Sequence, residues 1–412
     1  MVLQVCICGG GNGSHVSAGY IGAKEGEFKV NVFTRQPEDW QAGIKENGGM
    51  VVRTRKNSET EMKEIIGKIN KVSSDISEVA PGSDIFLLGG PAHANPIYLK
   101  AIAPYVQKGA IVGALFAQGG FDWAASQALG DKMKDITLYG LQNIPWICKK
   151  IKNGHSCRMI GPKKVLRVAA TPVKEADNVA KLMTKMFDIP CTTIPNFLSL
   201  TLTPSNQIIH PARFYGIFEG LFKWDGKSGF VQEKIPLLYD QVDKFSADCL
   251  QEVSDELQEL KKKLLEIFPK NLNLTEVKDL GQRIIDQYGD DVKDRSSLQQ
   301  IFCSNLGYRG CAVPTVPMPG NEDSGLVVPN VKSRLFIEDM PYGLVILINI
   351  GDIIGVKTPA FKKYLRYHQN LMNVPYLTDD NELNKELLPQ TGAPAAYGIT
   401  TPEQLVANSV SN

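Results

Sequence analysis

Cysteine is scarce in this sequence, neither sign of charge is in excess, and long hydrophobic runs are missing. Eight cysteines among 412 residues are too few and too scattered for a disulfide scaffold. The 45 Lys and Arg residues balance 44 Asp and Glu residues, so the net charge of +1 lacks the basic excess of a non-specific nucleic-acid binder. No window reaches the roughly 18 consecutive apolar residues of a membrane span. We therefore expect a reduced, cytoplasmic protein with no nucleic-acid or membrane partner.

Histidine is also rare, which argues against a metal site built from histidine ligands. Only five histidines occur, and none stands in the HxxxH or HExxH spacing of zinc enzymes. We expect no resident metal.

The first half of the sequence alternates short β-branched runs with amphipathic stretches, and its length allows two or three domains at about 150 residues each. Helices are predicted between the strands, for example at residues 59–72 and 97–107. Such alternation builds a parallel sheet covered by helices. The predicted strands are residues 2–8, 29–34, 84–88, 110–114 and 165–170.

After about residue 195 the pattern becomes mostly helical. Pro and Gly cluster at residues 310–329 and predict a long loop, and the stretch 388–412 is expected to be irregular. We therefore expect a Rossmann-type α/β domain at residues 1–198, followed by a mostly α-helical domain at residues 199–412. The predicted helices of the second domain are residues 211–223, 237–268, 274–288 and 296–306, with a helix pair within 341–372.

A glycine-rich run, Gly9-Gly10-Gly11-Asn12-Gly13-Ser14, follows the first predicted strand directly and leads into a predicted helix at residues 18–24. Gly9 permits a tight turn, Gly11 has no Cβ to block a pyrophosphate, and Ser14 is the third small residue, where helix and strand approach closely. We expect Gly9, Gly11, Asn12, Gly13 and Ser14 to bind a dinucleotide, whose phosphates would meet backbone N–H groups at the helix N-terminus. The alternative is a glycine-rich turn without a ligand.

The residue after the second predicted strand is Arg35, where an NAD-binding domain usually has an acidic residue for the ribose hydroxyls. An arginine here can meet the 2′-phosphate of NADP, or it can stack on the adenine face without any phosphate. Arg35 therefore leaves NAD and NADP both open.

Two prolines predict the starts of helices in the second domain. His210 precedes Pro211 and is expected to cap the helix that Pro211 begins, while Asp339 stands just before a helix started by Pro341. Two such helix starts would hold His210 and Asp339 rigidly enough to act as a pair. The alternatives are that both residues are only caps, and that the nearby Arg334 is only a solvated charge.

Six segments in the same order resemble those of the opine dehydrogenases, especially the octopine, tauropine, strombine and alanopine dehydrogenases of marine invertebrates. The resemblance covers nearly the whole chain and is specific to the family, although not to one amine substrate. The segments are GGGNGSH (9–15), QGGFDW (118–123), NIPW (143–146), HPAR (210–213), EDMPYG (338–343) and TGAP (391–394).

The resemblance implies an enzyme that uses NADH to condense pyruvate reversibly with the amino group of an amino acid or taurine, giving an N-(1-carboxyethyl) amino acid. It implies that His210 and Asp339 are the catalytic pair and that Arg334 binds a substrate carboxylate. Gln118 and Cys148 fall in segments that line the substrate site in the family, although Cys148 can equally be an inert buried thiol. The family favours NADH as the cofactor, with NADPH left open by Arg35.

The chemistry of a reductive condensation fits these residue types. One group must take and give protons near neutral pH, as a histidine does, while a carboxylate fixes its tautomer. A keto-acid carboxylate is best bound by the planar fork of an arginine. Two alternatives remain: another two-domain NAD(P)-dependent reductase of a 2-keto acid or ketone, and a dinucleotide-sensing protein without turnover. Which amine is used does not follow from the sequence.

Overall fold

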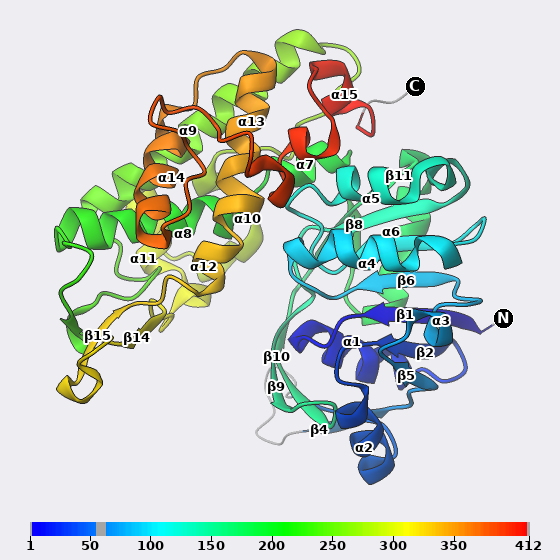
Figure 1. Ribbon diagram of the computed structural model, residues 1–412. Helices are drawn as coiled ribbons and strands as arrows, with labels where there is room; N and C mark the ends of the chain where they lie inside the picture. Colours follow the sequence, from blue (N-terminus) through cyan, green and yellow to red (C-terminus); the bar gives the residue numbers. More distant parts are fainter. Residues whose placement is uncertain (1, 55–62, 410–412) are drawn as a thin grey trace. The chain divides into compact units, whose positions relative to one another are not determined.

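A computed structural model describes residues 2–54 and 63–409 (Figure 1). The chain divides into two compact units. Unit 1 comprises Met1–Thr201 and Ala407–Asn412, and unit 2 comprises Leu202–Val406. The first boundary lies close to the predicted division after residue 198, whereas the segment from Ala407, which the sequence placed in the second domain, packs with unit 1.

Unit 1 is built on an eight-stranded sheet in which β5, β2, β1, β6, β7 and β8 run parallel. Chain order reverses at β1, which has β2 on one side and β6 on the other, and ligands of doubly wound folds bind where such a reversal occurs. In sheet order the strands are β12 (Cys191–Thr193), β11 (Leu166–Thr171), β8 (Thr137–Leu141), β7 (Ile111–Ala114), β6 (Ile85–Leu88), β1 (Leu3–Cys8), β2 (Phe28–Phe33) and β5 (Lys71–Ser73).

All five strands predicted in the first half are present, as β1, β2, β6, β7 and β11. The expectation of a parallel sheet fails at β11, which pairs antiparallel with β8. Between these two strands the chain forms a hairpin, β9 (Trp146–Lys152) and β10 (Ser156–Pro162), instead of a crossover helix. Parallel neighbours are usually joined by a crossover helix, and the described stretch between β8 and the antiparallel β11 contains none.

A second sheet of unit 1 has the order β4-β3-β10-β9, with β3 at Met50–Thr54 and β4 at Lys63–Gly67. The helix predicted at residues 59–72 is wrong: residues 59–62 lie outside the described part, and the rest contains β4 and β5. Ile65 and Ile66 are β-branched and pair with β3, and such a short apolar run fits a strand as well as a helix.

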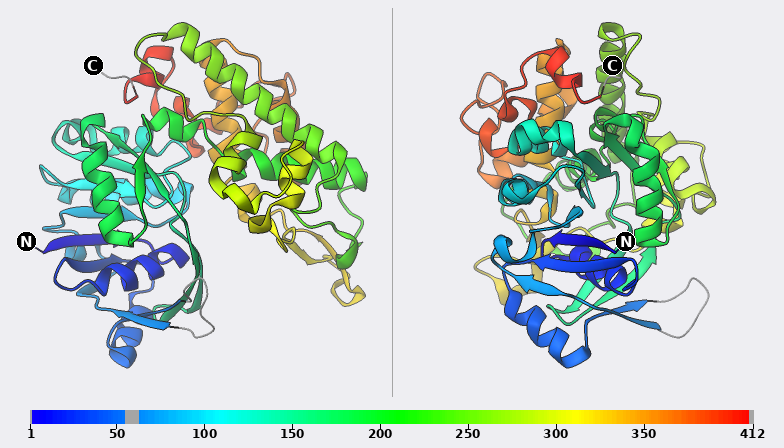
Figure 2. Two further views of the ribbon diagram at one scale, coloured as in Figure 1. Left: turned by 180° about the vertical axis from the view of Figure 1, so that it is seen from behind. Right: turned by 90° about the vertical axis from the view of Figure 1, so that its right-hand side faces the viewer.

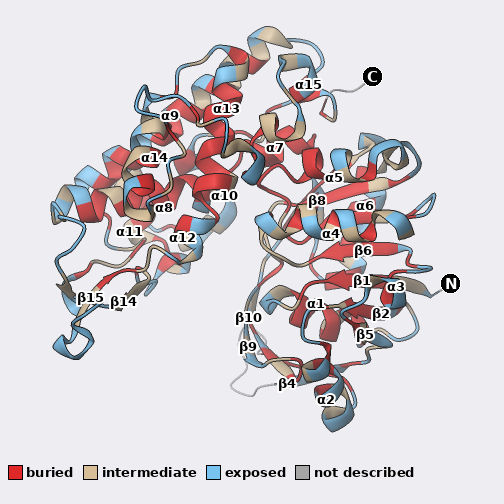
Figure 3. Ribbon diagram, viewed as in Figure 1, coloured by how far each residue is buried: buried red, intermediate tan, exposed pale blue. Residues whose placement is uncertain are grey.

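Helices cover both faces of the large sheet. The pair α4 (Asn95–Ile102) and α5 (Phe121–Leu129) lies in front of it in Figure 1, and α6 (Ala176–Phe187) lies in front in the view from behind in Figure 2. The four residues of β6 are fully buried, as expected for a strand covered on both sides (Figure 3). The remaining helices of unit 1 are α1 (Asn12–Gly22), α2 (Pro37–Asn47), α3 (Ile76–Val79) and α7 (Phe197–Thr201).

The returning C-terminal segment is hydrogen-bonded into unit 1. Asn408 Nδ2 donates to Ser126 Oγ on α5 at 3.0 Å, and Asn408 O accepts from Thr171 Oγ1 at 3.4 Å. The hydroxyl of Ser409 accepts from the backbone N–H of Leu198 on α7 at 3.0 Å. These bonds tie together three elements of unit 1 that are far apart in the sequence.

Unit 2 is mostly helical, as predicted, but the expected loop at residues 310–329 contains two strands of a small antiparallel sheet. That sheet has the order β13-β15-β14, with strands at Phe230–Val231, Leu326–Pro329 and Thr315–Pro317. Within the described part of the chain, no helix combines the length and the apolar character that crossing a bilayer requires. The helices are α8 (Asn206–Tyr215), α9 (Lys244–Ile267), α10 (Leu280–Tyr288), α11 (Leu298–Ser304), α12 (Arg334–Ile337), α13 (Val345–Ile354), α14 (Pro359–Met372) and α15 (Pro402–Val406).

The long helix α9 begins at Lys244, later than the predicted start at residue 237. Asp243 is its N-cap, and its carboxylate accepts from the backbone N–H of Ser246 at 2.9 Å. Residues 237–242 therefore form a separate segment ahead of the helix. One face of α9 is buried at spacings of three and four residues, through Leu250, Val253, Leu257, Leu260 and Leu264.

We predict that Leu257→Ala destabilises unit 2 by about 2–5 kcal/mol, because Leu257 is fully buried and its truncation leaves a cavity. Leu221→Ala makes the same chemical change at a side chain that is 56% exposed, and is expected to change the free energy of unfolding by no more than about 0.5 kcal/mol. Urea unfolding followed by circular dichroism measures both. Equal losses in the two variants would contradict the burial pattern of α9.

Candidate active site

His210 and Asp339 meet inside unit 2. Nδ1 of His210 lies 2.7 Å from Oδ2 of Asp339, and the two side chains are only 7% and 8% exposed. An ionised carboxylate can only accept, so the proton of this bond is on Nδ1 and the carboxylate fixes the tautomer of the imidazole. The sequence predicted the pair, and the structure brings it together.

The predicted reason for the position of His210 is wrong. Helix α8 begins at Asn206, so His210 lies inside the helix and Pro211 is an internal proline. A proline there removes only one backbone hydrogen bond, and the residues of α8 from Gln207 to Phe214 are all buried. Burial of α8 thus stabilises the helix on both sides of Pro211, although a proline usually marks a helix start.

Asp339 is the N-cap of a π-helical segment, Met340–Leu344, that leads into α13. Its carboxylate makes no capping hydrogen bond there, which leaves it available for His210. Burial raises the pKa of Asp339 above the ordinary value, while the imidazole of His210 opposes that rise. Burial and the imidazole of His210 thus act on the pKa of Asp339 in opposite directions.

Aromatic packing brings the two halves of the pair together. Phe214, one turn after His210, packs edge-to-face on Phe336 of α12 with ring centroids 4.8 Å apart. Gly343 adds a close approach, because a Cβ at this position would lie 2.4 Å from Cβ of Gln207 on α8. These contacts press α8 against the segment that carries Asp339.

Tyr239, which the sequence analysis missed, contacts the other nitrogen of the imidazole. Its hydroxyl lies 2.6 Å from Nε2 of His210. The predicted helix from residue 237 included Tyr239 and so hid it. The signal that could have separated Tyr239 from that helix is Asp243, the N-cap of α9. Both nitrogens of His210 are therefore hydrogen-bonded to side chains.

Arg334 lies at the start of α12, about one turn before Glu338 and Asp339. Its side chain is 64% exposed. Its Nε and Nη2 lie 2.7 Å and 2.6 Å from Oε2 of Glu338, whose side chain is 5% exposed. Its positive charge also acts on Asp339. The structure thus places Arg334 beside the His210–Asp339 pair, already engaged with a glutamate.

The glycine-rich loop follows β1 at the carboxyl end of the strand, and α1 starts within it at Asn12, earlier than predicted. Gly9 has φ +136°, a conformation that favours glycine. Among the described residues, a Cβ on Gly11 would meet the carbonyl oxygen of Gly89 alone, at 3.6 Å, which leaves room beside the first turn. Gly11 is the N-cap of the 11-residue α1 and has no side chain to cap it. The backbone N–H groups of the first turn are therefore available to a ligand at this end of the helix. The loop fits the pyrophosphate of a dinucleotide.

Side chains of the same loop hold its shape. Asn12 Oδ1 accepts from the backbone N–H of Lys150 on β9 at 3.0 Å, and Lys150 Nζ donates to the carbonyl of Gly10 at 3.3 Å. The hydroxyl of Ser14 donates to the carbonyl of Gly89, after β6, at 3.4 Å. Gly13 packs against Leu115, with only 3.1 Å left for a Cβ. Lys150 adds a positive charge beside the loop that the sequence did not single out.

Arg35 follows β2 and is exposed, and its charge acts on the half-buried Tyr98. Its position at the carboxyl end of β2 is the one from which the ribose of a bound dinucleotide is usually read. The predicted role of Arg35 is therefore consistent with its place in unit 1.

Two further predicted residues, Gln118 and Cys148, lie in unit 1. Gln118 is 2% exposed and stands between β7 and α5. Cys148 lies on β9, opposite Met159 of β10, and packs against the core of unit 1. Burial raises the pKa of the Cys148 thiol to about 11, so the thiol is neutral near pH 7.

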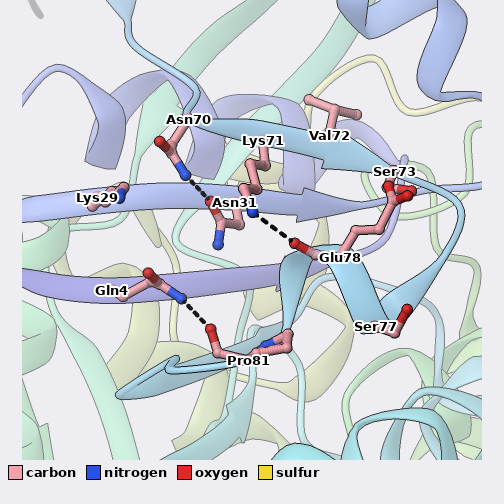
Figure 4. A pocket seen from close by; sticks show the side chains of 10 residues that line it. All are labelled: Gln4, Lys29, Asn31, Asn70, Lys71, Val72, Ser73, Ser77, Glu78 and Pro81. Atoms are coloured by element: carbon pink, nitrogen blue, oxygen red, sulfur yellow. Dashed lines mark hydrogen bonds between the residues drawn. The ribbon is translucent and has the colours of Figure 1, made fainter.

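Unit 1 also contains a cavity of about 660 Å³ along β1, β2 and β5 (Figure 4). Gln118, Cys148 and the glycine-rich loop do not line this cavity. Its polar side chains bond to one another and to backbone: Asn70 Nδ2 donates to Asn31 Oδ1 at 2.7 Å, and Gln4 Nε2 to the carbonyl of Pro81 at 2.8 Å. Because Gln4 and Asn31 precede the carboxyl ends of their strands, this cavity does not belong to the glycine-rich loop. We do not count it as part of the candidate site.

Known proteins resemble the chain over nearly its full length. A family model described as NAD/NADP octopine/nopaline dehydrogenase, alpha-helical domain, matches residues 193–372. Octopine dehydrogenase of Mizuhopecten yessoensis is 29% identical over 408 residues, covering 97% of this chain and 98% of that protein. Tauropine dehydrogenase of Arabella iricolor is 28% identical over 414 residues, covering 98% of this chain and 100% of that protein. A solved structure of octopine dehydrogenase in complex with NADH and agmatine has a TM-score of 0.87 and 25% identity, covering 99% of this chain and 98% of that one.

We predict that Cys148 reacts slowly with iodoacetamide in the native protein. Raising the thiol pKa from 9.0 to about 11 lowers the thiolate fraction at pH 7.5 by about 100-fold, and the thiolate is the reacting form. Mass spectrometry of the alkylated peptide gives the rate, and the same chain in urea provides the reference. Alkylation as fast as in urea would show an accessible thiol with an ordinary pKa instead of a packed one.

Proposed function

The chain belongs to the opine dehydrogenase family, and from this premise we propose that it is an NADH-dependent opine dehydrogenase. It condenses pyruvate with the amino group of an amino acid or of taurine and reduces the product to a secondary amine, in a reversible reaction. NADH, when bound, supplies the hydride that reduces the imine. The glycine-rich loop, with Gly9, Gly11, Asn12, Gly13 and Ser14, holds its pyrophosphate, and the position of Arg35 suits its ribose.

The buried hydrogen bond between His210 and Asp339 is the observation that carries this proposal. An amine must lose a proton before its nitrogen attacks the keto carbon, and the hydroxyl of the resulting carbinolamine must gain one before it leaves as water. An imidazole whose Nδ1–H is held by a carboxylate can take the first proton at Nε2 and return it in the second step. Asp339 stabilises the imidazolium formed in between.

Arg334 is proposed to bind the carboxylate of the keto acid. Glu338 occupies Nε and Nη2 of its guanidinium, so an incoming carboxylate uses the remaining Nη1 or replaces Glu338. Gln118 and Cys148 are assigned to the substrate site by family resemblance. For Cys148 that contribution is limited to packing, since its thiol is neutral near pH 7.

We also place the reaction in the cytoplasm. All eight cysteines are free thiols, including pairs as close in sequence as Cys6 and Cys8, which accords with a reducing compartment. Its partners are small molecules, namely the keto acid, the amine and the dinucleotide.

The proposal is tested by the consumption of NADH with pyruvate and a panel of amines: arginine, taurine, alanine and glycine. We expect oxidation that depends on both pyruvate and an amine, and a higher kcat/KM for NADH than for NADPH. Oxidation with pyruvate alone would identify a 2-keto acid reductase. NADH binding without consumption across the panel would identify a dinucleotide-sensing protein. A strong preference for NADPH would show that Arg35 reads a 2′-phosphate.

The roles of the pair are tested by His210→Gln and Asp339→Asn. His210→Gln is expected to lower turnover by about 10²–10⁴-fold with NADH affinity nearly unchanged. Asp339→Asn removes the charge that stabilises the imidazolium, so its lower activity is expected with the acid limb of the pH profile moved to lower pH. Circular dichroism checks the fold of both. Wild-type turnover in either variant would limit the role of that residue to packing and hydrogen bonding within unit 2.

A further inference from the structure

Tyr239 makes the second hydrogen bond of His210, and the proposed reaction does not yet use it. Its hydroxyl meets Nε2 at 2.6 Å, and its ring lies near both the imidazole of His210 and the ring of Tyr308. The rings of Tyr239 and Tyr308 are stacked, with their centroids 4.7 Å apart. Nε2 is the nitrogen that Asp339 leaves open for proton transfer, so its partner bears directly on the chemistry.

We propose that Tyr239 is a positioning residue of the proton-transfer site: its hydroxyl donates to the Nε2 lone pair of His210 and favours the neutral imidazole until a substrate group replaces the phenol. The proposal rests on the proposed role of His210 in the reaction. Tyr239 thus joins His210 and Asp339 as a third residue of the site, on a segment that is separate in sequence from both.

The direction of the hydrogen bond follows from the groups involved. Asp339 accepts from Nδ1–H, so Nε2 of the neutral imidazole carries a lone pair and the O–H of Tyr239 is the donor. Burial raises the pKa of the Tyr239 phenol above its ordinary value, which keeps the hydroxyl protonated. A donor at Nε2 stabilises the neutral imidazole, whereas the carboxylate at Nδ1 stabilises the charged one. The two partners of His210 thus act in opposite directions.

Arg213 shows that the position of Tyr239 is built into the fold. This arginine is fully buried on α8, one turn after His210, and its guanidinium binds the segment that carries Tyr239. The same helical turn therefore presents the imidazole and anchors the hydroxyl that meets it. Its bonds go to the carbonyls of Leu237 (3.1 Å), Leu238 (3.0 Å) and Gln241 (2.7 Å), and to Asp243 Oδ2 (3.1 Å) and Ser246 Oγ (2.6 Å).

The charged and titratable groups around the imidazole are few. On the Nδ1 side stands Asp339, with Glu338 and Arg334 acting on it. On the Nε2 side stands Tyr239, on which Cys311, Asp339 and Tyr288 act. Removing the phenol hydroxyl leaves the whole Nδ1 side in place. The imidazole then keeps the carboxylate that favours its charged form and loses the donor that favours its neutral form.

Tyr239→Phe tests this while keeping the ring that stacks on Tyr308. The acid limb of the pH–rate profile is expected to move to higher pH by about 0.4–1 unit, which is the size of one net hydrogen bond. Turnover at pH 7 falls and recovers as the pH rises, with the KM for NADH unchanged. Asp339→Asn moves the same limb in the opposite direction. The matched control is Tyr308→Phe, which removes a neighbouring hydroxyl that does not touch His210 and leaves the limb where it is.

The second measurement does not need turnover. Nitrogen-15 NMR of the imidazoles reports which ring nitrogen of His210 carries the proton, and with five histidines the His210 signal is assigned by its loss in His210→Gln. We expect the Nδ1–H tautomer in both the wild-type protein and Tyr239→Phe, because Asp339 still accepts from Nδ1, and a titration of His210 at higher pH in Tyr239→Phe. A wild-type His210 protonated on Nε2 in its neutral form, or an identical titration of His210 in the folded variant, overturns the proposal. Absence of opine formation with the expected tautomers refutes only the proposed function.

Discussion

One short hydrogen bond, 2.7 Å between His210 Nδ1 and Asp339 Oδ2, joins parts of unit 2 that are 129 positions apart in the sequence. A buried carboxylate is tolerated only with a partner, so α8 and the segment after α12 must meet in one register. The packing of Phe214 on Phe336 brings the two elements together, but apolar packing alone would permit small shifts. The hydrogen bond selects a single arrangement, and the rest of the unit is built around it.

Two buried polar side chains of α8 illustrate different uses of such groups. Arg213 has its guanidinium matched by five hydrogen bonds to one segment and the start of α9, so its burial is compensated and its place is fixed. His210 has two partners with opposite preferences for its charge state. A side chain that is fully satisfied in one state serves structure, whereas one balanced between two states can exchange a proton.

The sequence predicted those parts of the fold and site that depend on local rules. A glycine-rich run after an apolar strand identified the dinucleotide loop, and proline-adjacent residues directed attention to His210 and Asp339. Long-range packing decided the features that were missed. Pro211 lies inside a helix because its surroundings are buried, and the isoleucines of β4 form a strand because β3 lies beside them.

Tyr239 and the ion pair of Arg334 with Glu338 belong to the same class of unpredictable features. The cap at Asp243 separates Tyr239 from α9, but its contact with His210 comes from the segment that Arg213 holds in place. Glu338 reads in the sequence as an ordinary neighbour of Asp339, but its carboxylate is buried and engages the arginine. In both cases the partner is known only once the helices are packed.

The return of the chain to unit 1 at Ala407 has a consequence for how the protein is made. Ser409 bonds to Leu198, and Asn408 bonds to Ser126 and Thr171, so these contacts cannot form until the ribosome has synthesised all of Leu202–Val406. Domains usually fold in order as they emerge during synthesis. Here unit 1 emerges first, yet its α5, β11 and α7 gain these hydrogen bonds only after the whole of unit 2 has been synthesised.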